Sequence, residues 1–181
     1  MTRLRPTAIS GAVALALSLA SGAAKDIHAL KDWPVFAATA KTWEGVGVSF
    51  DIVDGQLGDA VTFRDRWEAE FKEDGRLMEM RGVTRAGGRK IEYLWRFRFH
   101  PETETVTGEF ETSEGGARAV EVTVVAEGKR IEIRTPQSAD SKAGLAMDIY
   151  LEDGGDLITE TRTFDREGKD NYRSAARYRA D

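Results

Sequence analysis

The chain has 181 residues, with 26 Lys and Arg against 31 Asp and Glu, and it contains no cysteine. That length fits a single domain of ordinary size. The acidic balance argues against nucleic acid and anionic membrane surfaces as partners, because like charges repel. Without cysteine no disulfide can form, so the hydrophobic core alone must hold the fold together.

Residues 1–24 have the order of a secretory signal peptide. Arg3 and Arg5 precede an uncharged, mostly apolar run at residues 8–20, and small residues follow at 21–24. The run is too short for a membrane span, which needs roughly 20 apolar residues, and no later stretch reaches that length. We therefore expect cleavage near residue 24 and a periplasmic or secreted location. The remaining chain has 24 basic and 31 acidic residues, a net charge of −7.

A short helix is expected between this signal and the first strand. Pro34 suits the first turn of a helix, and Asp32 or Trp33 would stand just before it. Apolar residues such as Phe36 follow at once. Residues 25–42 then form a cap that plugs one end of the fold, or a plain linker that leads into it.

From residue 43 onward, apolar and polar residues alternate in short runs, which is the period of a half-buried β-strand. Turn signals such as Asp54-Gly55 and Glu127-Gly128 end the runs, because Gly tolerates the positive φ of tight hairpins. The pattern predicts ten strands, at residues 43–53, 60–72, 76–84, 89–99, 104–112, 118–126, 130–135, 144–151, 157–164 and 171–179.

Connections this short cannot carry a parallel crossover, which takes a dozen or more residues. Strands that are adjacent in sequence should therefore pair in space. The predicted fold class is all-β: an antiparallel up-and-down barrel of about ten strands over residues 43–181, with a short N-terminal helix. Closure removes the exposed sheet edges that an open sheet would leave. A curled half-barrel is the alternative.

The alternation also predicts which side chains line the interior, since a slip of one residue would turn each strand inside out. The expected inward sets are Val46, Val48, Phe50 and Ile52 in the first strand; Val61, Phe63, Trp67, Ala69 and Phe71 in the second; Ile91, Tyr93, Trp95, Phe97 and Phe99 in the fourth; Val120, Val122, Val124 and Ala126 in the sixth; and Leu145, Met147, Ile149 and Leu151 in the eighth.

The first strand opens with Thr42-Trp43-Glu44-Gly45-Val46-Gly47, and the second carries the segment at residues 63–75. A Trp followed by Gly-x-Gly, and then a meander of about ten strands, resembles lipocalin-like (calycin) barrels, and especially small exported bacterial proteins of that type with no assigned function. The resemblance implies an interior that holds an apolar small molecule or haem, although some such barrels have no known ligand. Trp43 would close one end by packing, with the glycines allowing a close approach.

No residue cluster has the spacing that a known chemistry needs. His28 and His100 are the only histidines, and none follows position 100, where haem-binding barrels of similar shape place theirs. No Ser–His or Cys–His arrangement is present, and Gly45-Val46-Gly47 sits in a strand pattern instead of a phosphate loop. We therefore expect no enzymatic activity, no metal site and no cofactor.

Charged residues interrupt faces that should be apolar. Asp65 falls on the inward face of the second strand, and either face of strand 157–164 carries polar groups. A buried charge needs a partner, and Asp65 with Arg162 is one candidate pair. The predicted ligand-binding residues are Asp65, Trp67, Met78, Met80, Tyr93, Trp95, Phe97, Glu160 and Arg162.

These features predict an exported barrel that binds a small apolar or amphipathic molecule in its interior. The alternative is a solid-core structural or protein-interaction module, which would use its Arg- and Glu-rich outer face or a free strand edge. Neither interpretation includes nucleic acid or a membrane span in the processed chain.

Overall fold

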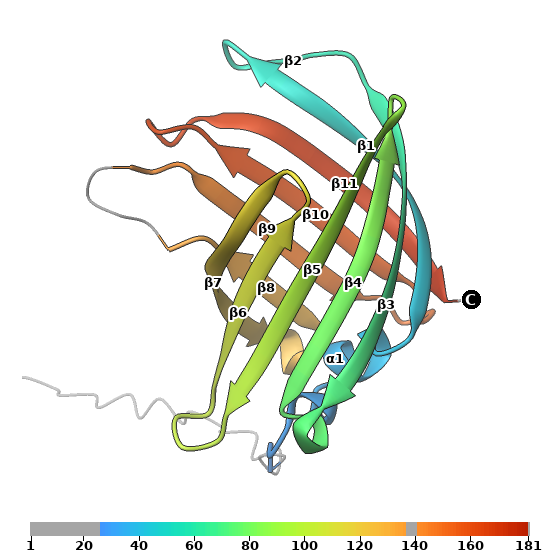
Figure 1. Cartoon of the computed structure of the whole chain (residues 1–181), viewed down its shortest axis with the longest axis vertical. Helices are drawn as coiled ribbons and strands as arrows, with labels where there is room; N and C mark the ends of the chain where they lie inside the picture. Colours follow the sequence, from blue (N-terminus) through green and yellow to red (C-terminus); the bar gives the residue numbers. More distant parts are fainter. Residues whose placement is uncertain (1–25, 137–140, 181) are drawn as a thin grey trace, which may run out of the picture.

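A computed structural model of the chain describes residues 26–136 and 141–180 (Figure 1). The predicted signal peptide, residues 1–24, and its cleavage site lie outside the described residues. Of the predicted cap segment, residues 26–42 are described. No helix in the described part of the chain is long and apolar enough to cross a membrane.

Ten long strands form one antiparallel sheet in which each strand pairs with its neighbours along the chain. The last strand also pairs with the first, from Trp43↔Ala180 to Asp51↔Tyr172, so the sheet closes into a barrel. The all-β up-and-down barrel is confirmed, and the half-barrel alternative is wrong. The strands are β1 (Thr42–Val53), β3 (Val61–Lys72), β4 (Leu77–Ala86), β5 (Arg89–His100), β6 (Thr105–Thr112), β7 (Gly115–Val125), β8 (Arg130–Arg134), β9 (Gly144–Leu151), β10 (Leu157–Phe164) and β11 (Asp170–Ala180).

The sequence did not predict the two-residue strand β2 (Gln56–Leu57). It folds back on the end of β1 through the turn Asp54-Gly55, whose two residues have φ values of 53° and 76°. Two consecutive positive φ angles suit the right-handed twist of a hairpin. In the described sheet, β2 pairs only with β1, so this hairpin extends past the body of the barrel (Figure 1).

A helical cap closes the opposite end of the barrel. It consists of the 3-10 turn η1 (Leu30–Asp32) and the helix α1 (Pro34–Thr39), with Trp33 between them as the N-cap. The Phe36 side chain is fully buried, and its ring lies 5.5 Å from that of Phe97 on β5. The helix predicted from Pro34 is therefore present, and it plugs the barrel end where β5 finishes (Figure 1).

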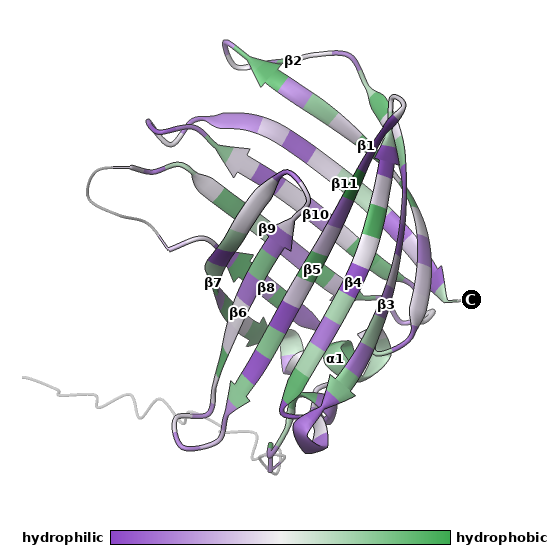
Figure 2. Ribbon diagram, in the orientation of Figure 1, coloured by the Kyte–Doolittle hydropathy of each residue, from purple (hydrophilic) through white to green (hydrophobic). Residues whose placement is uncertain are grey.

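The predicted alternation holds along most of the wall, and Figure 2 shows it as polar and apolar bands along the strands. Phe63, Trp95 and Ile149 are all buried in the interior, as predicted. The core extends from these residues to the cap, where Leu30, Val35 and Phe36 are fully buried.

In β1 the predicted facing is wrong. Val46 is 57% exposed on the outer surface, where it pairs with Arg64 and Arg177. The lumen instead receives Trp43, which is fully buried, and the glycines that follow it at every second position. Those glycines leave room for large rings from neighbouring strands, and the face of β1 that carries Val46, Val48, Phe50 and Ile52 is the outer one.

We predict that matched valine truncations will separate the two faces. Val120 is 5% exposed in the lumen, whereas Val46 is outside, and both lie in strands. Val120→Ala should reduce the free energy of unfolding by about 2 kcal/mol, through lost burial and a residual cavity. Val46→Ala should change it by less than about 0.5 kcal/mol. Denaturant unfolding of both variants measures this, and equal losses would contradict the facing described here.

Candidate functional site

The lumen is not filled. A cavity of about 470 Å³ lies between the β4–β5 turn and the middle of the barrel, on the side away from α1. A volume of this size suits a drug-sized molecule. Most of its wall is apolar or aromatic, including Phe63, Trp67, Met80, Trp95, Phe110 and Met147. A polar group of five side chains lies on the same wall: Asp65, Thr84, Tyr93, Thr159 and Tyr178.

The Asp65 carboxylate is the centre of this polar group. Its Oδ1 accepts a hydrogen bond from the Thr84 hydroxyl at 2.7 Å. Its Oδ2 accepts from the hydroxyls of Tyr93, at 2.8 Å, and Tyr178, at 3.0 Å. The residue is only 6% exposed, so these bonds replace the water that it loses on folding. We call Asp65, Thr84, Tyr93 and Tyr178 the Asp65 cluster.

Strand register and two glycines bring this cluster together. Tyr178 on β11 pairs with Gly45 on β1, and Gly45 pairs in turn with Asp65 on β3. On the other side, Tyr93 on β5 pairs with Gly82 on β4. A Cβ at Gly45 would lie 2.3 Å from the Tyr178 ring, and one at Gly82 would lie 2.1 Å from the Tyr93 ring. Each tyrosine thus leans across a glycine to reach Asp65 from two strands away.

Burial raises the pKa of Asp65 above its ordinary value of 3.8, and the hydrogen bonds from Thr84, Tyr93, Tyr178 and the Arg66 amide oppose that rise. No Lys, Arg or His side chain in the described part of the chain contributes to holding this carboxylate. Burial also raises the pKa of Tyr93 and Tyr178 well above 10.0, with the Asp65 charge as the next cause. Both phenols therefore stay protonated and serve as donors.

Seven of the predicted ligand-binding residues lie in the interior, and five of them line the cavity. Those five are Asp65, Trp67, Met80, Tyr93 and Trp95. Met78 and Phe97 are fully buried nearer the cap, and they do not line the cavity. They belong to the packed core under the cavity floor, where Phe97 contacts the helix α1.

Glu160 and Arg162 were predicted to face inward and lie on the outer surface instead. The lumen face of β10 carries Thr159 and Thr161, which line the cavity. Threonine can be buried with its hydroxyl bonded, whereas a charged side chain pays several kcal/mol on burial, and this difference decides the facing. The predicted pair of Asp65 with Arg162 is therefore wrong. Glu160 instead accepts from the Tyr150 hydroxyl at 3.2 Å.

Sequence reasoning did not identify Thr84, Thr159 and Tyr178 as site residues. Tyr178 alternates with two arginines in β11, which indicated its inward direction but not its partner. Thr159 hydrogen-bonds the Tyr178 hydroxyl and holds it in place. The contact between Tyr178 and Asp65 joins residues 113 positions apart, so no local pattern could reveal it.

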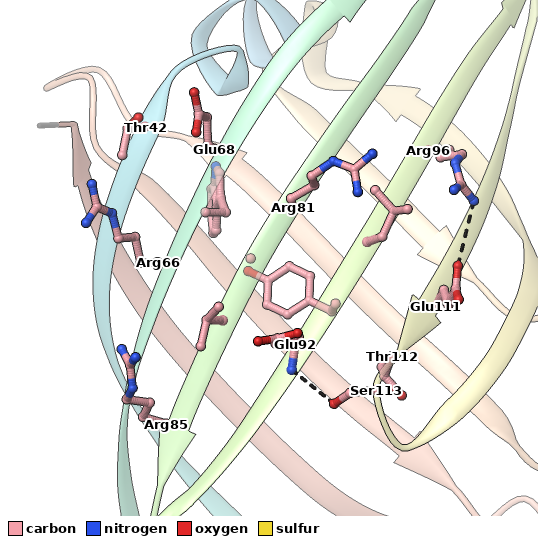
Figure 3. Close-up of a pocket in the computed structure, with 15 residues that line it drawn as sticks. Thr42, Arg66, Glu68, Arg81, Arg85, Glu92, Arg96, Glu111, Thr112 and Ser113 are labelled. Carbon is pink, nitrogen blue, oxygen red and sulfur yellow. Dashed lines mark hydrogen bonds and ion pairs between the residues drawn. The ribbon is translucent and has the colours of Figure 1, made fainter.

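A second and larger hollow, of about 810 Å³, lies on the outer face of β3, β4 and β5 (Figure 3). Arginines and glutamates line it, and several of them pair with charged residues in or beside it. Arg96 lies 2.5 Å from Glu109 and 3.9 Å from Glu111, and the Glu92 amide donates to Ser113 Oγ at 3.2 Å. It is open to water and lined mostly by exposed or half-buried side chains, so we take the lumen as the candidate site.

The described residues show no metal centre and few unpaired buried polar groups. No three His, Asp or Glu side chains converge on a metal position within residues 26–136 and 141–180. The indole nitrogens of Trp43 and Trp67 lack a hydrogen-bond partner, but both atoms are themselves buried.

We predict that Asp65 makes the free energy of unfolding depend on pH in a defined direction. Its pKa is higher in the folded protein than the ordinary 3.8, so the folded state binds this proton more tightly. The stabilising contribution is complete below about pH 3.8 and is lost as the pH rises through the folded pKa. As the pH increases through this range, the free energy of unfolding of the natural protein should therefore fall relative to that of Asp65→Asn. Denaturant unfolding across a pH series tests this, and a flat difference would refute it.

We also predict that the two cluster glycines are intolerant of a methyl group. Gly45→Ala and Gly82→Ala would each force a tyrosine ring to move, at about 1–3 kcal/mol of unfolding free energy. Gly116 in β7 has open space around its would-be Cβ, so Gly116→Ala is the matched control and should be neutral or slightly stabilising. Thermal or denaturant unfolding compares the three, and an equal response would contradict the packing of the tyrosines over glycine.

Comparison with known proteins gives a fold without a family. No protein-family model matches the chain, and no curated protein sequence matches it. Among solved structures it is similar to the S-type phycobiliprotein lyase CPES from Guillardia theta, with a TM-score of 0.57 and 11% identity over 80% of this chain and 89% of that one. It is also similar to Rv2717c from M. tuberculosis, with a TM-score of 0.55 and 13% identity over 86% and 99% of the two chains.

A third similar structure is a DUF3598-family protein of unknown function from Nostoc punctiforme PCC 73102, with a TM-score of 0.55 and 10% identity. The match covers 80% of this chain but only 48% of that longer one. At such low identity these similarities speak for the fold alone. The fold of this chain is thus a closed, lipocalin-like ten-stranded barrel.

Proposed function

We propose that this protein is an exported barrel that binds a small, partly apolar molecule in its lumen and carries out no chemical step on it. The observation that carries the proposal is the cavity of about 470 Å³ inside a closed wall, lined by aromatic and apolar side chains and bearing one held polar cluster. Binding sites for small molecules commonly have this composition, with an apolar wall that supplies affinity and a few polar groups that orient the ligand.

The two ends of the barrel differ in a way that supports binding. The cap and the large buried side chains under it pack one end of the barrel. The other end has half-exposed polar residues and hairpin turns, so the cavity opens there. A molecule would enter between the turns with its polar group leading toward Asp65, while its apolar part would stay against Phe63, Trp95 and Phe110.

The similarity to a phycobiliprotein lyase is compatible with a lumen that receives a small molecule. It does not favour an enzyme, because the cavity wall offers a single buried carboxylate. The other lining acid, Asp51, is exposed, so the wall does not present two buried carboxylates together. The solid-core alternative is disfavoured by the cavity itself.

The proposal predicts that filling the cavity abolishes uptake of a neutral apolar probe. Leu145 is half-buried on the cavity wall, and Leu145→Trp would place an indole in the space. The fluorescent probe N-phenyl-1-naphthylamine should bind the natural protein and lose at least about tenfold in affinity with Leu145→Trp. The matched control, Val46→Trp, adds the same ring to the outer face and should leave binding unchanged.

Two results would count against the proposal. The first is no enhancement of probe emission by the natural protein at any concentration. The second is that both tryptophan variants bind the probe as tightly as the natural protein does. Native mass spectrometry of protein isolated from its own host is the complementary measurement, and a co-purifying small molecule is the expected result.

A further inference from the structure

We propose that the ligand is a small organic cation: an amphipathic amine whose protonated nitrogen lies against the Asp65 cluster. This inference rests on the proposed function and names the chemical class that the lumen selects. Three features of the described cavity wall support it: the direction of the hydroxyl hydrogens, the balance of charge, and the aromatic rings.

The hydroxyls of the Asp65 cluster can only accept hydrogen bonds from a ligand. Each hydroxyl has one hydrogen and two lone pairs. Thr84, Tyr93 and Tyr178 each donate that hydrogen to the Asp65 carboxylate, at 2.7, 2.8 and 3.0 Å. What they present to the cavity is therefore oxygen lone pairs. A ligand with N–H donors meets matching acceptors, whereas a carboxylate or phosphate finds no free donor in the cluster.

The charge of the cavity wall also favours a cationic ligand. The partners of Asp65 are neutral hydroxyls and a backbone amide, so its negative charge has no counter-ion within the described residues. The one basic side chain among the described lining residues, Arg89, is exposed at the β4–β5 turn and lies 2.7 Å from Glu114. A buried anion without a cation is costly, and a ligand ammonium supplies the missing charge.

Aromatic rings lie close to the Asp65 carboxylate. Trp67 and Tyr178 lie with ring centroids 4.1 Å apart, and Tyr178 and Tyr93 both touch the carboxylate through their hydroxyls. Trp95 stacks on Phe110 at 4.1 Å farther along the wall. Ring faces attract cations and also pack against alkyl groups, so a carboxylate set among rings suits an alkylammonium group.

The test compares three ligands of equal chain length with different head groups. Calorimetric titration of the purified natural protein with n-octylamine, 1-octanol and octanoate at pH 7 measures the preference directly. Octylammonium should bind at least about tenfold tighter than octanol, the ratio that one charged hydrogen bond supplies, and octanoate should bind more weakly than octanol. This comparison needs no variant, so it stands even where a substitution disturbs folding.

Two matched variants locate the effect. Asp65→Asn should reduce octylammonium binding to within about twofold of octanol. Asp51→Asn makes the same change at an exposed acid on the wall of the same cavity, and it should alter octylammonium binding by less than about threefold. A preference that survives in Asp65→Asn would overturn the assignment to this cluster.

The outcomes separate this inference from the proposed function. If all three ligands bind the natural protein equally, or octanoate binds most tightly, the cation is wrong and the ligand-binding lumen stands. If none of the three binds, and the neutral probe of the previous section also fails, the lumen is not a binding site and both proposals fall.

Discussion

The pairing of β1 with β11 closes the wall, and the interior exists only because of it. β1 pairs with β3 along one edge and with β11 along the other, so one strand carries the register of both sides. Through Gly45, this register places Tyr178 level with Asp65 across the seam. Without closure, Asp65 would keep Thr84 and Tyr93 but lose its third hydroxyl donor, and the cavity would be an open groove.

The Asp65 cluster is a compromise between two costs. Burying a carboxylate raises its free energy, and four neutral hydrogen-bond donors reduce that penalty without removing it. The space needed by the two tyrosine rings comes from glycines, which remove packing surface from the wall at those positions. A core selected for stability alone would place apolar side chains there, so this arrangement is typical of a site.

Much of the fold could be predicted because its signals are local. All ten long strands, their turns and the short helix at Pro34 follow from period-two alternation, glycine-containing turns and a proline at a helix start. Five of the nine predicted site residues line the cavity for the same reason: the faces of β3, β4 and β5 are unambiguous. The errors fall on β1 and β10, where both faces of the strand mix apolar and polar residues.

The sequence by itself determined that this chain forms hairpin-linked strands and that most of them have one solvent-facing and one interior-facing side. It also determined that an acid, Asp65, interrupts the interior-facing side of β3. Only the tertiary structure decided which way β1 and β10 face and which groups hold that acid. Those outcomes depend on the space and partners that other strands provide, as with Tyr178, which reaches Asp65 from 113 positions away. Strand alternation is set by neighbouring residues, whereas the filling of a closed interior is set by all of its walls together.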